Sequence, residues 1–319
     1  MKHHPSAFDA VIFDIDNVLV DTRRSYLDTI RWTVEIFLTY GKVPFFCPGH
    51  KSRDPQLLSR EDVDQFKLFG GFNDDWDCCY GLLVYLLNLR VKSRTLEALK
   101  RTINMKGLAR KATQRPLRVS GVVKMFGVTG LVTIERIARI FQEVYLGKEL
   151  FEPLEKQRAT YWKKRGLLHL EKPIFRKSIL EKLKQHGIGL GIATGRPRFE
   201  AQYALKNFGL LDCFEAITTI DDVKKAEVQL KQSLRKPHPY SVLETAKKMG
   251  PKKRFLYVGD LPDDILAARE ARATLDIRAV GFPWFASNPK GALHEIEKAK
   301  PDFILKKPGD LLKIVLRGK

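Results

Sequence analysis

The residues Ala10-Val-Ile-Phe-Asp-Ile-Asp-Asn-Val-Leu-Val20 decide the fold of this chain. They begin with a short apolar run ending at Phe13, rich in β-branched and aromatic residues, which predicts a buried strand. Two carboxylates, Asp14 and Asp16, follow it directly. Side chains two apart lie on the same side of an extended chain, and open α/β sheets bind ligands at the carboxyl ends of their strands. We therefore expect both carboxylates to face a site at that edge, although such pairs also occur in solvated turns.

From about residue 173 onward, strand-like runs alternate with helical patterns. This alternation predicts an α/β fold with a Rossmann-like, doubly wound parallel sheet. The predicted strands after the first are Ile188 to Ala193, Ala216 to Thr219, Phe255 to Val258 and Ile277 to Val280, and the predicted helices are one opened by Pro197, Pro239 to Met249 and Pro262 to Ala273.

Between the first strand and residue 173 the patterns are mostly helical. We therefore expect a discontinuous core, residues 1–21 and 173–319, that carries an inserted, mostly α-helical cap domain, residues 22–172. The predicted cap helices are Tyr26 to Thr39, Glu61 to Phe69, Trp76 to Leu89, Thr95 to Ile103, Thr133 to Tyr145 and Pro153 to Lys164. The stretch from Gly107 to Gly130 gives no clear pattern.

Composition and charge exclude several classes of protein. With 44% hydrophobic residues among 319, the chain is too apolar for a disordered protein, and its formal net charge of +20 favours anionic substrates. The longest nearly apolar run, Cys78 to Leu87, is about half of the roughly 20 residues that a membrane span needs. The first residues also lack the pattern of a signal peptide. We expect a cytoplasmic protein with no membrane partner.

The cysteines and the basic residues are distributed unevenly. Four cysteines without a C-x-x-C spacing are expected to be reduced thiols. Eleven basic residues and one acidic residue, Glu97, lie between Arg90 and Lys124. Such a stretch is typical of a solvated helix surface, and it is also compatible with nucleic-acid binding, which we do not favour. The oligomeric state is left open.

Two further groups of residues are suited to anions. After the strand at Ile188 to Ala193 come Thr194, Gly195 and Arg196, where a hydroxyl and backbone N–H groups at a helix start form a cradle for phosphate. The alternative is that Thr194 only caps the helix. Lys236, held before Pro237, is suited to neutralising a phosphate or a nucleophilic carboxylate, or it is an ordinary solvated lysine.

The last strand end carries three carboxylates, Asp260, Asp263 and Asp264. Like charges this close repel one another, so a cation is expected there, and Mg2+ prefers oxygen ligands and bridges to phosphate. Asp260 follows the strand directly and is the stronger candidate ligand. Asp263 is explained by an acidic first turn that complements the helix dipole.

These four motifs together resemble those of the haloacid dehalogenase (HAD) superfamily. The helical insertion resembles the type 1 cap of its phosphoglycolate-phosphatase-like members, although at roughly 150 residues it is about twice the usual size. The resemblance implies that Asp14 attacks phosphorus to form an aspartyl phosphate and that Asp16 protonates the leaving group and then activates water. It also implies that Asp14, Asp16 (through its carbonyl), Asp260 and Asp264 hold Mg2+, with Thr194 and Lys236 acting on the phosphoryl group.

The resemblance therefore predicts a magnesium-dependent phosphatase that acts on a small phosphomonoester. A phosphomutase shares the four motifs, and a nucleic-acid-associated protein with an inactive or end-trimming core is the alternative from another class. A second candidate site lies in the cap, where two glycines precede polar residues and an aromatic. Those residues either contact the substrate or simply cap and pack a helix; they are Asn73, Asp74, Asp75 and Trp76.

Overall fold

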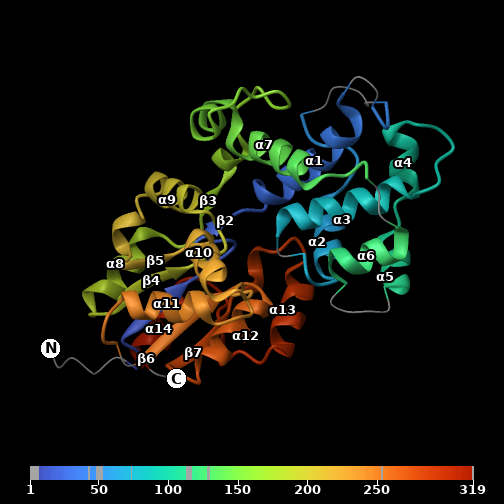
Figure 1. Cartoon of the computed structure of the whole chain (residues 1–319). Helices are drawn as coiled ribbons and strands as arrows, with labels where there is room; N and C mark the ends of the chain where they lie inside the picture. Colours follow the sequence, from blue (N-terminus) through green and yellow to red (C-terminus); the bar gives the residue numbers. More distant parts are fainter. Residues whose placement is uncertain are drawn as a thin grey trace. The chain divides into compact units, whose positions relative to one another are not determined.

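The computed structural model describes residues 7–41, 44–47, 53–72, 74–112, 117–127, 130–252 and 254–317. The chain divides into two compact units (Figure 1). Residues 1–22 and 172–319 form the first, which we call the core unit, and residues 23–171 form the second, which we call the cap.

Six parallel strands form the sheet of the core unit, in the order β5-β4-β1-β6-β7-β8. This confirms the predicted α/β fold with a doubly wound parallel sheet. A separate antiparallel pair, β2 with β3, stands where the chain leaves and re-enters the unit. The strands are β1 Ala10–Phe13, β2 Val20–Asp21, β3 Lys172–Pro173, β4 Gly189–Ala193, β5 Ala216–Thr218, β6 Arg254–Gly259, β7 Asp276–Gly281 and β8 Phe303–Ile304.

Strand β1 is apolar at every position because it is buried on both faces. Val11 and Phe13 pack into one layer, which receives side chains of α8, α9 and α14, while Ala10 and Ile12 pack into the opposite layer with α11, α12 and α13. The helices of the unit are α8 Lys177–Gln185, α9 Arg198–Asn207, α10 Ile220–Leu230, α11 Tyr240–Lys248, α12 Pro262–Ala271, α13 Pro289–Lys298 and α14 Asp310–Arg317.

The register of the central strands brings three of the four motifs to one edge. Phe13 of β1 lies opposite Ile192 of β4 on one side and Val258 of β6 on the other. Because all three strands run in the same direction, the residues after each of them emerge together. Asp14, Thr194 and Asp260 therefore share the carboxyl edge of the sheet.

The described part of the cap is helical. Its helices are α1 Tyr26–Thr39, α2 Arg60–Lys67, α3 Asp75–Leu87, α4 Leu96–Thr102, α5 Met105–Lys111, α6 Arg118–Phe126 and α7 Ile134–Glu155. Helix α6 and most of helix α5 fall in the stretch that the sequence leaves unclear. Helix α7 is kinked at Gly147, whose φ of 72° lies in the left-handed region. A side chain there would collide with the backbone of Gly166.

The predicted helix from Pro153 to Lys164 is wrong. Helix α7 continues through Pro153 and ends at Glu155, and the residues after it form a loop. The loop is held by the buried carboxylate of Glu143, which accepts backbone N–H groups at 2.6 to 3.0 Å from three consecutive residues, Thr160, Tyr161 and Trp162. These N–H groups are satisfied without a helix, so the local helical pattern does not decide the structure.

Candidate active site

Asp14 lies immediately after β1, with its backbone N–H donating to the carbonyl of Val258. Its carboxylate is almost completely buried, and Oδ1 accepts a hydrogen bond from Lys236 Nζ at 3.2 Å. Lys236 also contacts Asp264 Oδ1 at 2.8 Å and the carbonyl of Ala193 at 3.0 Å. The lysine is therefore a fixed charge between two carboxylates, and not the solvated side chain that the sequence left open.

Asp264 is held by four hydrogen-bond donors. Its Oδ1 accepts from Lys236 and from the hydroxyl of Tyr257 at 3.0 Å, and its Oδ2 accepts the backbone N–H groups of Asp260 and Leu261 at 3.2 and 3.0 Å. Gly259 makes this close approach possible, because a β-carbon there would lie 2.2 Å from the β-carbon of Asp264. The carboxylate of Asp264 thus fixes the loop that carries Asp260.

Asp14, Asp260 and Asp264 form a buried cluster in which one ligand oxygen from each lies within 4.8 Å of the others. In the part of the chain that the structure describes, Asp14 Oδ2 and Asp260 Oδ1 accept no hydrogen bond. Two such carboxylate oxygens at the ends of adjacent strands fit a hard divalent cation such as Mg2+. The donor set of this cluster can therefore bind a metal ion.

The electrostatics of the cluster point the same way. Burial raises the pKa of Asp14 to about 7 against the lowering effect of Lys236, and the charges of Asp264 and Asp16 add to the rise. Burial also raises the pKa of Asp260 well above its usual range, with Asp264 and Asp14 contributing. One ammonium does not balance these carboxylates, so a bound cation would offset the remaining repulsion.

Asp16 is engaged by a buried arginine. Its Oδ1 accepts from Arg196 Nε at 2.7 Å and lies 2.6 Å from the second guanidinium nitrogen, and the Arg196 side chain has no exposed area. The sequence predicts Arg196 as a substrate-binding residue; the structure additionally makes it the partner of Asp16. A guanidinium that contacts one oxygen by two nitrogens fixes the orientation of the carboxylate.

Thr194 and Gly195 follow β4. The Thr194 hydroxyl accepts the backbone N–H of Arg196 at 3.2 Å, whereas α9 begins at Arg198 with Pro197 as its N-cap residue. Thr194 therefore closes a tight turn before the helix and is not its N-cap. Gly195 is exposed, and a β-carbon there would meet nothing within 4 Å.

The sequence analysis missed two other contact residues, Asn17 and Tyr257. Their partners, Asp260 and Asp264, are 243 and 7 residues away along the chain.

The candidate cap residues have structural roles in the cap itself. The carboxylate of Asp74 accepts the N–H groups of Trp76 and Asp77, which makes it the N-cap of α3. Asp75 pairs with Lys67 at 2.5 Å. Asn73 lies outside the described residues. The contacts of Asp74 and Asp75 match the alternative in which these residues cap and pack a helix, and contact of residues 73–76 with the substrate stays a prediction.

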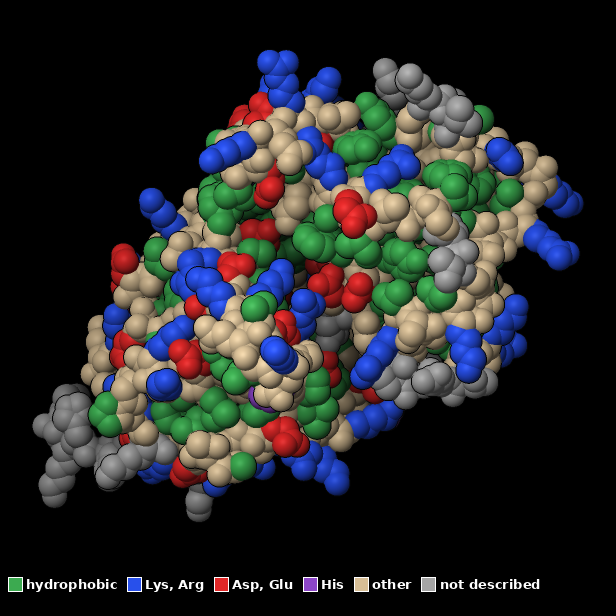
Figure 2. Space-filling view, in the orientation of Figure 1, with side chains coloured by type: hydrophobic (Ala, Val, Ile, Leu, Met, Phe, Trp, Pro, Cys, Tyr) green, Lys and Arg blue, Asp and Glu red, His purple; other side chains and the backbone are tan. Residues whose placement is uncertain are grey.

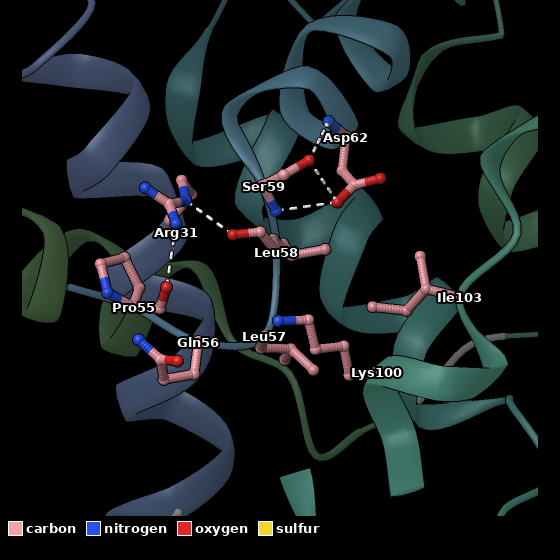
Figure 3. Close-up of a pocket in the computed structure, with 9 residues that line it drawn as sticks. All are labelled: Arg31, Pro55, Gln56, Leu57, Leu58, Ser59, Asp62, Lys100 and Ile103. Atoms are coloured by element: carbon pink, nitrogen blue, oxygen red, sulfur yellow. Dashed lines mark hydrogen bonds between the residues drawn. The ribbon is translucent and has the colours of Figure 1, made fainter. Parts of the chain in front are cut away.

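A pocket of about 250 Å3 opens in the cap (Figure 3). The Arg31 guanidinium donates to the carbonyls of Leu58 and Pro55, and Ser59 and Asp62 bond to each other as a capping box. These polar groups therefore form their hydrogen bonds with other residues that line the pocket. None of the lining residues belongs to the four motifs; they are Arg31, Pro55, Gln56, Leu57, Leu58, Ser59, Asp62, Lys100 and Ile103.

Comparison with known proteins identifies the family. The model of the haloacid dehalogenase-like hydrolases matches residues 8–272. The chain belongs to the haloacid dehalogenase-like hydrolases. This confirms the resemblance drawn from the four motifs and the prediction that the protein is a hydrolase. Among the described residues of this hydrolase, no helix is both long and apolar enough to cross a membrane.

Three relatives of this HAD-like hydrolase show the extent of the similarity. A protein of Caldanaerobacter subterraneus provisionally named pyrophosphatase PpaX is 29% identical over 195 residues, 61% of this chain and 77% of that protein. Phosphatase Tt82 from Thermococcus thioreducens has a TM-score of 0.62 at 23% identity, covering 97% and 99% of the two chains. A structure described as a predicted phosphoglycolate phosphatase of Haemophilus somnus has a TM-score of 0.54 at 20% identity, covering 97% and 98%.

The structural likenesses show a shared fold. The chain matches between 42% and 57% of the length of several other curated relatives. The substrate therefore has to be argued from the site.

Proposed function

We propose that this chain is a magnesium-dependent phosphatase that works through a phosphoryl group carried on Asp14. The observation that carries the proposal is the buried cluster of Asp14, Asp260 and Asp264 around Lys236 at the carboxyl edge of the sheet. When bound, Mg2+ would supply charge that orients the substrate phosphate and stabilises the transition state. Asp14 and Asp260 would hold it, with the carbonyl of Asp16, while Asp264 positions the loop.

The proposed reaction has two steps. In the first, an Asp14 oxygen forms a bond to phosphorus as the bond to the leaving oxygen breaks, and Asp16 gives its proton to that oxygen. In the second, Asp16 takes a proton from water, whose oxygen attacks phosphorus and releases Asp14. Lys236 and Thr194 would stabilise the charge on the phosphoryl oxygens.

The substrate class is a small phosphorylated compound. A phosphomonoester is the prediction from the motifs. Pyrophosphate is a second candidate, because the Caldanaerobacter relative carries the name of a pyrophosphatase. Residues 73–76 of the cap stay candidates for contact with the leaving group.

A substrate panel tests the proposal. Purified full-length protein with Mg2+ is assayed against sugar phosphates, phosphoglycolate, nucleotides, pyrophosphate and terminally phosphorylated oligonucleotides. We expect release of inorganic phosphate from one small-molecule class, abolished by EDTA and restored by Mg2+. Conversion of a sugar phosphate to its isomer without phosphate release would identify a phosphomutase instead. Activity confined to oligonucleotides would favour the nucleic-acid alternative.

A further inference from the structure

Asn17 occupies an unusual backbone position next to the candidate site. Its φ of 53° lies in the left-handed region, in the tight turn that joins β1 to β2. The turn is closed by its backbone N–H, which donates to the carbonyl of Val20 at 2.7 Å. A residue with a β-carbon carries a steric cost in this conformation, which asparagine tolerates better than most residues.

The Asn17 amide joins two separate parts of the core unit. Its Nδ2 donates to Asp260 Oδ2 at 3.3 Å. Its Oδ1 accepts from the Thr22 hydroxyl at 3.0 Å and from the Thr22 backbone N–H at 3.4 Å. Asp260 is a candidate metal ligand, and Thr22 is the last residue of the core unit before the chain enters the cap.

We infer that Asn17 is a positioning residue. It orients Asp260 for the metal ion and connects Asp260 to Thr22, where the chain leaves the core unit and enters the cap. The inference rests on the metal site of the proposed function. The Asn17 donor satisfies Oδ2 and leaves Oδ1 for the cation, and partners of this kind orient carboxylate ligands.

The planar amide of Asn17 couples its contact with Thr22 to its contact with Asp260. Nδ2 and Oδ1 belong to one rigid group, so a change at Thr22 that turns the amide also moves the donor away from Asp260. A change in the backbone at Thr22 can thus alter the position of Asp260, even though Thr22 itself need not contact the substrate. Glycine at this position would keep the backbone conformation and remove both contacts.

Mg2+ binding to the full-length chain without substrate, measured by isothermal titration calorimetry, tests the inference. We expect Asn17→Gly to weaken Mg2+ binding about ten-fold, the lower end of the range for loss of a partner to a metal ligand. Lys231→Gly is the matched control, because Lys231 also has a φ of 53° and is exposed at the end of α10. It should bind Mg2+ like the wild type.

Two more variants extend the test. Asn17→Ala removes both amide contacts without adding a charge, so it provides a second measurement if Asn17→Gly does not fold. Thr22→Val should weaken Mg2+ binding by a smaller factor in the wild-type background and have no further effect in Asn17→Gly, because the connection is already lost.

Each outcome decides a separate point. Wild-type Mg2+ affinity in both Asn17 variants would overturn the positioning role. Equal effects of Thr22→Val in the two backgrounds would overturn the connection. A wild-type protein that binds Mg2+ with the expected variant pattern but releases no phosphate from any substrate would refute the proposed function and leave the role of Asn17 intact. A wild-type protein that binds no Mg2+ would refute both.

Discussion

The charged side chains at the sheet edge of the core unit differ from those in the basic stretch of the cap, residues 90–124. At the sheet edge, charged contacts join residues far apart in the chain, such as Asp14 with Lys236 and Asp16 with Arg196, and their partners are largely buried. In the cap, every described basic residue between Arg90 and Lys124 is exposed. Figure 2 shows such side chains projecting from the region of α4 to α6. Their ion pair between Arg101 and Glu97 spans one helical turn.

This difference shows that the number of charged residues in a region does not by itself indicate a function. Burying a charge is costly unless it is paired, so a cluster of buried carboxylates around one lysine marks a candidate functional site. Exposed charges on helices carry little such cost and are screened by salt. The surplus of positive charge is therefore weaker evidence of function than the few charges at the sheet edge.

The largest expected effect is at Asp14. Asp14→Asn removes the proposed nucleophile and one metal-binding oxygen, so turnover should fall below about one hundredth of the wild-type rate while the fold is retained. Phosphate release and circular dichroism measure the two parts of this prediction. Asp276→Asn, an exposed carboxylate at the start of β7, is the control and should retain activity. Substantial turnover in Asp14→Asn would exclude Asp14 as nucleophile.

Asp16→Asn should divide substrates by their leaving group. An amide cannot supply a proton, so hydrolysis of an alkyl phosphate should slow far more than the first step with p-nitrophenyl phosphate. Water activation is lost as well, so the phosphorylated enzyme should accumulate and appear as added phosphoryl mass after quenching. Equal losses for both substrates, without accumulation, would contradict an acid–base role for Asp16.

Much of this arrangement follows from sequence, because strand ends and helix starts have strong local signals. The strand at residues 10–13 and the helix at residues 26–39 are observed as predicted. Strand β8 has two residues and gives no usable pattern. The pairing of Arg196 with Asp16 and of Asn17 with Asp260 depends on which strands lie side by side, which no local pattern contains. The false helix after Pro153 has the same origin, a long-range contact to Glu143.

An added methyl group should lower the free energy of unfolding at Gly259 of the core unit and leave it nearly unchanged at Gly130 of the cap. Gly259→Ala places a methyl group against Asp264, and overpacking of this kind costs about 1 to 3 kcal/mol. Gly130→Ala in the cap, where an added β-carbon meets nothing within 4 Å, should leave the free energy of unfolding nearly unchanged. Urea denaturation monitored by fluorescence measures both. Similar values for the two variants would mean that the contact of Gly259 with Asp264 is looser than described.

The raised pKa of Asp14 predicts a pH dependence of stability without metal. The folded chain keeps a proton on Asp14 up to about pH 7, whereas the unfolded chain releases it near 3.8, so this group contributes stability that declines as pH rises between these values. In EDTA, the unfolding temperature of the wild type should fall between pH 5 and pH 8 relative to that of Asp14→Asn. Stabilisation by Mg2+ should grow over the same range, because the ion competes with the proton. Parallel profiles for the two proteins would contradict the raised pKa.

The smallest expected effect is at the basic surface of the cap. If these exposed residues are solvated, changing four of them to glutamine should alter the turnover of a small substrate little at any salt concentration; they are Lys100, Arg101, Arg110 and Lys111. A polyanion held through several phosphates would instead dissociate steeply and log-linearly with salt. We expect at most micromolar, non-specific oligonucleotide binding by fluorescence anisotropy. Tight oligonucleotide binding at 0.15 M salt that disappears in the quadruple variant would contradict this expectation. It would show that the basic residues of the cap bind nucleic acid.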